Sequence, residues 1–193
     1  MYVISTTNLK LLVCLKRYNC DFLMTPQNIN RERYKNEAVA ITSNRGLAML
    51  ALVDGAKVYE TVTMSSLIPD DCSNEELLDK IIDEFLEVLG IRKNFNGYEY
   101  LKYIITCNVK DDEYCLKAMS KEVYPECAKA FGVSPVTVAR TTNDLIKKSY
   151  GRKPEMYSAL YAKDHPDKIN AAPKANNFVV VMANKIRALM PNI

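Results

Sequence analysis

The segment spanning residues 122–150 constrains the fold of this chain more than any other. It indicates two short helices joined by a tight turn at Gly132. Glycine readily takes the left-handed conformation that ends a helix, and Ser134 followed by Pro135 is typical of a helix start. Ala128 is small enough to let the second helix cross close to the first. This is the layout of a helix-turn-helix, although a plain helical hairpin in a core has the same pattern.

The second helix of this motif, expected over residues 134–150, has one apolar and one polar face. Val138, Leu145 and Ile146 recur at helical spacing and are expected to face inward. The opposite face is polar and is the one that would enter a major groove of DNA. The predicted DNA-binding residues are Lys129, Ser134, Thr137, Arg140, Asn143, Asp144, Lys147 and Lys148.

The distribution of charge favours DNA binding over the plain hairpin. Residues 126–153 contain six basic and two acidic side chains, a net charge of +4, whereas the whole chain has a net charge of +3. The remainder of the chain therefore sums to −1. The positive charge is concentrated where phosphate contacts would be needed.

Composition restricts the class of protein further. The chain has 193 residues, 48% hydrophobic and 25% charged, as in an ordinary globular protein of one sizeable or two small domains. The six cysteines include no CxxC pair and there is one histidine, so no zinc site is predicted. The first residues make a poor signal peptide and no apolar run is long enough to span a membrane. We therefore expect reduced thiols in a cytoplasmic protein.

Residues 1–70 are expected to form a small α/β domain. Strands are predicted at residues 2–4, 21–24, 38–42 and 57–62, and a helix at residues 8–18. The segment 47–53, LAMLALV, is ambiguous, because Leu and Ala favour a helix whereas the following Asp54-Gly55 is a hairpin signal. A helix gives an α/β unit, which we favour, and a strand gives an antiparallel meander.

Residues 73–193 are expected to form a nearly all-α domain, separated from the first by the polar, proline-containing segment 68–73. Ser73 and Glu76 form a capping box before a clear amphipathic helix that Gly90 closes. Besides this helix and the helix-turn-helix, helices are predicted at residues 97–107, 114–120, 155–161 and 176–189, with residues 108–113 as a loop.

Several segments of this second domain resemble a known family. They are the LG that precedes GYEYLKYII, the VYPECAKAF helix, the V-x-R core of the next helix and the late FVVVMANKIR. In order and spacing, residues from about 75 to 193 resemble the C-terminal DNA-binding effector domain of the sporulation-initiation response regulators. The resemblance implies a six-helix effector domain that recognises promoter DNA through residues 134–150, as a homodimer or tandem pair, with RNA polymerase as a further partner.

The recognition helix departs from the pattern of that family, whose members typically carry an outer face rich in arginine, glutamate and histidine. Arg140 keeps the family identity, and it is a natural partner for guanine O6 and N7. The other outer positions are Thr137, Ala139, Asn143 and Asp144. Asn143 suits adenine, whereas Asp144 would repel phosphate but could accept a hydrogen bond from cytosine. We therefore expect DNA binding with an altered operator.

The family also has a receiver domain, and residues 1–64 have a weak likeness to its later part. Thr25-Pro26 stands where the phosphorylated aspartate is expected, and no lysine follows KVYETV at the right place. Either this is a degenerate, truncated receiver that lacks the phospho-acceptor, or the α/β pattern arises by chance.

Other candidate sites have simpler interpretations. His165 is expected in a surface loop without a nucleophile motif, and the cluster at residues 111–113 as a solvated acidic loop. Tyr98, Tyr100 and Tyr103 are expected to pack in the core and at its boundary rather than to stack on bases. No catalytic residue, cofactor or metal is predicted.

The predicted function is sequence-specific transcription regulation. The alternative is an interaction protein that pairs with an intact regulator as an antagonist or scaffold, which Asp144 and the missing outer arginines suggest. An enzyme that uses residues 1–70 has no motif behind it.

Overall fold

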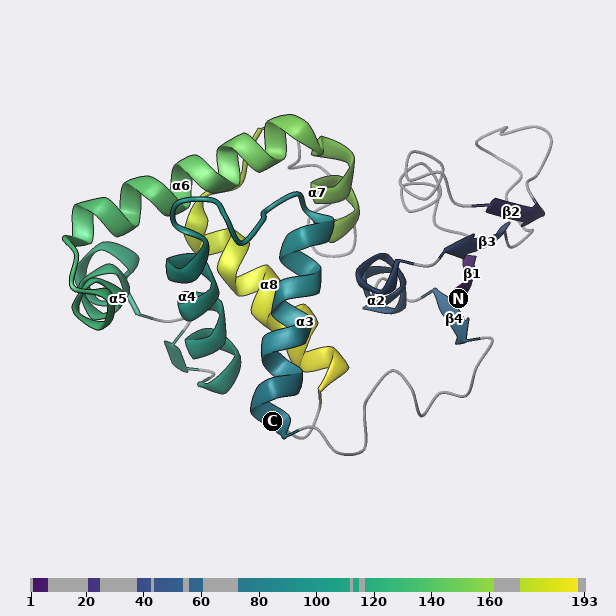
Figure 1. The fold of residues 1–193 in the computed structure, drawn as a ribbon, viewed down its shortest axis with the longest axis horizontal. Coiled ribbons are helices and arrows are strands. Elements are labelled where there is room, and N and C mark those ends of the chain that lie inside the picture. The colour runs from purple at the N-terminus through teal and green to yellow at the C-terminus, as the bar shows by residue number, and fades with distance from the viewer. Residues whose placement is uncertain are drawn as a thin grey trace.

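The structure is a computed structural model that describes residues 2–6, 21–24, 38–42, 44–53, 56–60, 73–111, 113–114, 117–161 and 171–190. Four short strands form one sheet: β1 (Tyr2–Thr6), β2 (Asp21–Met24), β3 (Ala38–Thr42) and β4 (Lys57–Glu60) (Figure 1). Their order is β2-β3-β1-β4. In the middle of β1, the fully buried Ile4 lies opposite Ala40 of β3 and Val58 of β4. The predicted strands are confirmed where they are described, and the predicted helix at residues 8–18 lies outside the described residues.

The ambiguous segment LAMLALV is helical and belongs to α2 (Arg45–Val53). The side chain of Asn44 accepts a hydrogen bond from the backbone N–H of Leu47 at 3.0 Å, which fixes the start of the helix. Leu47 and Leu50 are buried. The helix prediction is confirmed, and the alternative of a meander with a strand in this position is excluded.

The likeness to a receiver domain does not extend to the pairing of the strands. β1 is antiparallel to both β3 and β4, and β2 is antiparallel to β3. A receiver has a doubly wound sheet of parallel strands joined by helical crossovers. Of the two alternatives, the described strands therefore favour an α/β pattern unrelated to a receiver, and their positions along the chain agree with the predicted ones.

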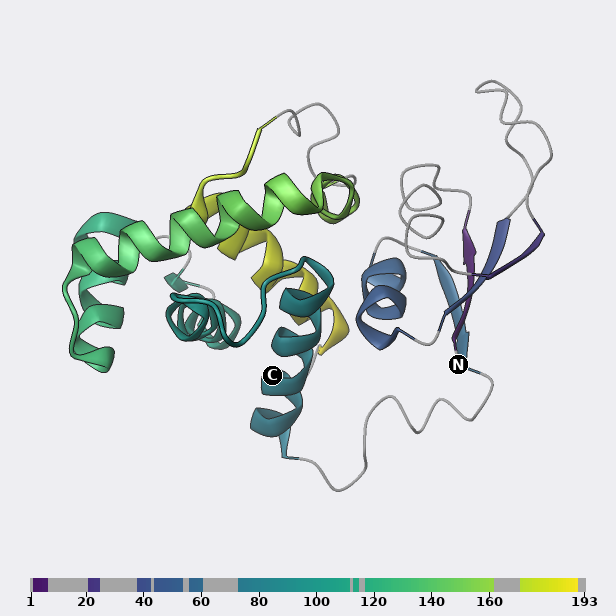
Figure 2. The same ribbon diagram turned by 45° about the horizontal axis from the view of Figure 1, so that its top comes forward.

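Helix α2 joins the sheet to the helical part of the molecule. In both views it lies between the sheet and α3 (Asn74–Val88) (Figures 1 and 2). The two helices meet closely at Gly46, where an added Cβ would lie 2.5 Å from Val88 Cγ2 and 2.8 Å from the backbone oxygen of Glu84. Only glycine fits at this contact without a shift of one helix.

Six α-helices and one π-helix make up the described part of residues 73–190, as the prediction of a mainly α, six-helix unit requires. Besides α3 they are α4 (Tyr98–Lys110), the π-helix η3 (Met119–Val123), α5 (Tyr124–Phe131), α6 (Pro135–Arg152), α7 (Pro154–Tyr161) and α8 (Ala175–Leu189). The predicted cap of α3 is confirmed, because the Ser73 hydroxyl accepts from the backbone N–H of Glu76 at 3.3 Å. Helix α8 packs against α4 and α3, and Phe178 lies fully buried in this core.

Helix α4 is one turn longer than predicted and continues to Lys110, through residues expected as a loop. Arg187 of α8 explains the difference: its guanidinium donates to the backbone oxygen of Asn108, and to that of Val109 at 3.3 Å. The last carbonyls of a helix have no partner inside it. A side chain distant in sequence satisfies them here.

The helix predicted at residues 114–120 is also corrected, since residues 117 and 118 are not helical and the π-helix η3 begins only at Met119, directly before α5. The carboxylate of Glu122 accepts from the backbone N–H of Ala118 at 3.2 Å and so caps the start of η3. Pro125 follows in the first turn of α5. A proline ring clashes with the carbonyl four residues earlier in an α-helix, and the wider π-turn relieves this crowding.

Candidate nucleic-acid interface

The helix-turn-helix is formed by α5 and α6, and its turn has the predicted geometry. Gly132 ends α5 with φ of +66°, and the N–H of Val133 donates to the backbone oxygen of Ala128 at 3.0 Å. Ser134 then caps α6, accepting from the backbone N–H of Thr137 at 3.1 Å. These local bonds fix the angle between the two helices.

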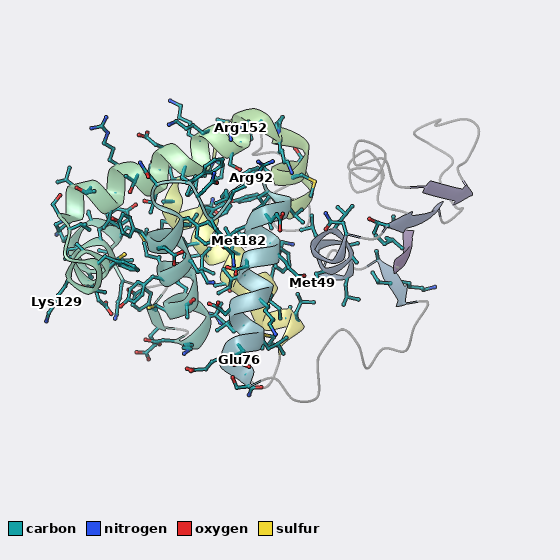
Figure 3. All side chains as sticks on the ribbon, in the orientation of Figure 1. Met49, Glu76, Arg92, Lys129, Arg152 and Met182 are labelled. Carbon is teal, nitrogen blue, oxygen red and sulfur yellow. The ribbon has the colours of Figure 1, made fainter. Side chains whose placement is uncertain are left out.

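Helix α6 divides into the two predicted faces. Val138, Leu145 and Ile146 are buried. The polar residues predicted on the outer face all have exposed side chains, namely Thr137, Arg140, Asn143, Asp144, Lys147 and Lys148. Ser134 and Lys129 are also exposed, but Lys129 lies on α5 and points away from α6 (Figure 3). The structure thus brings together seven of the eight candidate residues and separates Lys129 from them.

Two candidate base-reading side chains are already engaged within the protein. The amide nitrogen of Asn143 donates to the backbone oxygen of Ala139 at 2.7 Å and to the hydroxyl of Tyr124 at 3.3 Å, which links α6 to α5. Arg140 Nε lies 3.9 Å from a carboxylate oxygen of Asp144, one turn further along α6. Since the Arg140 side chain is 82% exposed, this ion pair is weak and leaves the guanidinium accessible.

Helix α6 is anchored to the body of the domain at its C-terminal half. The Ser149 hydroxyl donates to the backbone oxygen of Leu89 and accepts from the hydroxyl of Tyr157 at 2.9 Å. Lys153 Nζ donates to the backbone oxygen of Val88 at 3.0 Å. The end of α3 therefore holds α6 in place.

The loop of residues 91–97, which connects α3 to α4, lies against the flank of α6. Gly97 has φ of +87°, and a Cβ added there would lie 3.0 Å from Thr141 Cβ and 3.1 Å from its backbone carbon. Lys93 ties the loop to α3 through an ion pair with Asp83 at 2.6 Å. The loop is thus held between two helices.

Asp83 is the centre of a small cluster that fixes this loop. It also accepts hydrogen bonds from Tyr98 at 2.5 Å and Lys102 at 2.6 Å. Burial alone would raise the pKa of Asp83, but the hydrogen bonds from Lys102, Lys93 and Tyr98 together hold it below its ordinary value. The carboxylate therefore stays charged at neutral pH.

A groove of about 640 Å³ lies between the 91–97 loop and α6. The loop contributes one wall and the side chains of α6 the other. Its lining comprises Asn94, Phe95, Asn96, Val136, Thr137, Arg140, Thr141, Asp144, Leu145, Lys148, Ser149 and Arg152. The prediction from sequence did not include Phe95 or Arg152 among the site residues. The only local signal was the run IRKNFNG, which places basic and amide side chains around an aromatic ring.

The tyrosines of α4 pack within the domain, as predicted. Tyr98 is buried, and Tyr100 and Tyr103 meet the ring of Phe131 edge to face, with centroids 5.1 and 5.7 Å apart. They connect α4 to the end of α5 and thereby support the turn. His165 lies outside the described residues.

The described cysteines have the properties of structural residues. Burial raises the pKa of the Cys127 thiol to about 12 and also raises that of Cys107. Both thiols are therefore protonated and poorly nucleophilic at neutral pH. In the part of the chain that the structure describes, no three acidic, cysteine or histidine side chains gather as a metal site would require.

A helix-turn-helix with an exposed basic face, carried on a six-helix body, defines the class of DNA-binding regulator domains. The family model described as Sporulation initiation factor Spo0A C terminal matches residues 82–186, more than half of the chain. The chain belongs to this family, which consists of sporulation regulators with a DNA-binding domain and is not a family of enzymes. No helix among the described residues is long and apolar enough to cross a membrane.

Proposed function

We propose that this protein regulates transcription by binding duplex promoter DNA in a sequence-specific way, with α6 in the major groove. The observation that carries the proposal is the exposed polar face of α6, on which Arg140 projects with 82% of its side chain accessible. A guanidinium in this position is suited to the bidentate contact with guanine O6 and N7.

The other candidate residues have distinct roles in this proposal. Lys147 and Lys148 contact phosphates, which position the protein without reading the sequence. Ser134 and Thr137 lie at the N-terminus of α6, where their exposed hydroxyls and the positive end of the helix dipole suit phosphate. Asn143 reads adenine only if it gives up its bond to Tyr124. Lys129 contributes to the general positive potential.

The proposal extends to the assembly and to the whole chain. Residues 73–193 are the DNA-binding unit, residues 1–70 are a small α/β domain that packs against it through α2, and the protein acts in the cytoplasm as a homodimer or tandem pair beside RNA polymerase. Thr25-Pro26 follows β2, so regulation does not use a phospho-acceptor aspartate at that position.

Selection of random duplexes by the full-length protein, followed by anisotropy titrations of the selected duplex, tests the proposal. Arg140→Ala should weaken specific binding by about 1–3 kcal/mol, roughly 5- to 150-fold in dissociation constant. Lys121→Ala removes an equal charge from the exposed surface of η3 and should leave the preference unchanged. Enrichment of no sequence, and binding insensitive to salt, would contradict the proposal.

A second candidate function is favoured by the surroundings of Arg140. Asp144 lies close enough to reduce its positive potential, and Asn143 is already bonded to α5. A protein with this face could pair with an intact regulator as an antagonist or scaffold. Co-purification of the full-length chain with such a regulator, combined with no protection of promoter DNA, would favour this function over the first.

A further inference from the structure

The groove beside α6 has one wall formed by the 91–97 loop and one formed by polar and charged side chains of α6. Asn94 and Phe95 stand on the 91–97 loop, and α6 supplies a row of side chains spaced one turn apart, Arg140, Asp144, Lys148 and Arg152. Three of these four are basic and one is acidic, a net charge of +2. The acid lies at the end of the row near Arg140, so the other end is entirely basic.

Arg152 is held in the groove by an aromatic contact. Its guanidinium carbon lies 5.2 Å from the centre of the Phe95 ring. A cation–π contact of this kind orients the guanidinium without using its N–H donors. Among the described residues, neither Arg152 nor Lys148 has a carboxylate within salt-bridge distance. Their charges are therefore available to an anion from outside.

The length of α6 brings this basic end to the edge of a bound duplex. Its 18 residues extend over about 27 Å, whereas the major groove of DNA is about 12 Å wide. With Arg140 at the bases, the C-terminal half of α6 leaves the groove and passes the sugar-phosphate backbone. Lys148 and Arg152 lie one turn, or about 6 Å, apart there, close enough to act on one phosphate or on adjacent ones.

We propose that the groove between the 91–97 loop and α6 binds a backbone phosphate of DNA, with Lys148 and Arg152 as its ligands. Phe95 is a positioning residue that holds the Arg152 guanidinium, and Asn94 offers an amide donor from the loop. The loop is thus a second DNA-contacting element beside the helix-turn-helix. This inference rests on the proposed function of α6 and adds a contact that is blind to sequence.

The test uses the full-length protein, its selected duplex and a scrambled duplex, titrated at several salt concentrations. Arg152→Gln should weaken binding to both duplexes by the same factor and lower the slope of log affinity against log salt by about 1. Arg140→Ala should instead reduce the preference between the duplexes. Lys121→Gln, with the same loss of charge on η3, is the matched control.

Neutral methylphosphonates, introduced one at a time into the selected duplex, identify the phosphate. One substitution should weaken binding of the wild-type protein, weaken that of Arg152→Gln less, and cause no further loss in a variant in which both Lys148 and Arg152 are replaced by glutamine. Phe95→Leu should weaken binding, and adding it to Arg152→Gln should cause no loss beyond that of Arg152→Gln alone. Phe95→Tyr keeps an aromatic ring and should bind DNA as the wild-type protein does.

The outcomes separate this inference from the function on which it rests. If the wild-type chain shows no salt-dependent binding, the proposed function fails. If it binds, and Arg140→Ala relaxes the preference while Arg152→Gln leaves affinity and salt slope unchanged, only the phosphate site is overturned. Arg152 is exposed, so its substitution leaves the fold intact even if Phe95→Leu does not.

Discussion

Replacing Gly97 with alanine perturbs the place where the 91–97 loop meets the middle of α6. Two independent costs arise at this position. The residue has φ of +87°, which an alanine adopts with difficulty, and its new Cβ would lie 3.0 Å from Thr141 Cβ. The first cost is local to the backbone, whereas the second pushes α6 away from α4.

The magnitude follows from these two terms. A left-handed conformation costs a non-glycine residue about 1–2 kcal/mol, and overpacking of a close contact costs about 1–3 kcal/mol. We expect the free energy of unfolding to fall by about 3 kcal/mol. For a chain of this size, the melting temperature should fall by roughly 6–12 °C.

Two other glycines provide matched controls for the assay, which is denaturant unfolding followed by circular dichroism. Gly132 has φ of +66° with no atom within 4 Å of an added Cβ, so Gly132→Ala isolates the backbone cost of about 1–2 kcal/mol. Gly151, within α6, also has open space around it. Gly151→Ala should therefore stabilise the protein by about 0.5–1 kcal/mol.

Equal shifts for Gly97→Ala and Gly132→Ala would refute the reasoning, because the contact with Thr141 would then carry no energy. If the contact does carry energy, Gly97→Ala should also weaken DNA binding by the folded protein, since α6 is displaced. Gly151→Ala should leave DNA binding unchanged.

Three further substitutions test other contacts. Asp83→Asn should lower the free energy of unfolding by about 2 kcal/mol at pH 7. The pKa of Asp83 is lower in the folded than in the unfolded protein. The stability that the charged carboxylate provides is therefore present above the unfolded pKa of about 3.9 and is lost as the pH falls through the folded pKa. The free energies of unfolding of the wild-type and Asp83→Asn proteins should therefore begin to converge below about pH 4. A constant difference between them would contradict this account. Tyr157→Phe removes the donor to the Ser149 hydroxyl and should cost about 1 kcal/mol, measured by urea unfolding; no change would mean that this bond does not anchor α6. Gly46→Val should force α2 away from α3 and lower the free energy of unfolding by about 2–3 kcal/mol. The amide hydrogens of α2 should then exchange faster, and unchanged exchange would argue against a close contact between the two helices.

The sequence contained enough information for the helix-turn-helix because its signals are local. Gly132, Ser134 and the spacing of Val138, Leu145 and Ile146 each act within one or two turns of the chain. The helix at residues 47–53 was favoured for the same reason, since leucine and alanine favour a helix, although the following Asp54-Gly55 left a strand as the alternative.

The features that the sequence did not reveal depend on partners distant along the chain. The extension of α4 requires Arg187, nearly 80 residues later, to bond with its last carbonyls. Antiparallel pairing of β1 with β3 and β4 is likewise non-local, so strand patterns alone could not distinguish it from a receiver. The groove was not predicted either, because no local pattern shows that the 91–97 loop faces α6.

The last turn of α3 serves two neighbours at once. On one side Val88 meets Gly46 of α2. On the other, the backbone oxygens of Val88 and of Leu89, which follows it, accept hydrogen bonds from Lys153, just after α6, and from Ser149 of α6. The sheet and the helix-turn-helix therefore share one piece of scaffold. In a chimeric regulator, a foreign N-terminal module would have to pack a helix as closely against this turn as α2 does at Gly46. Otherwise the turn would shift, and α6 would no longer be held in its position.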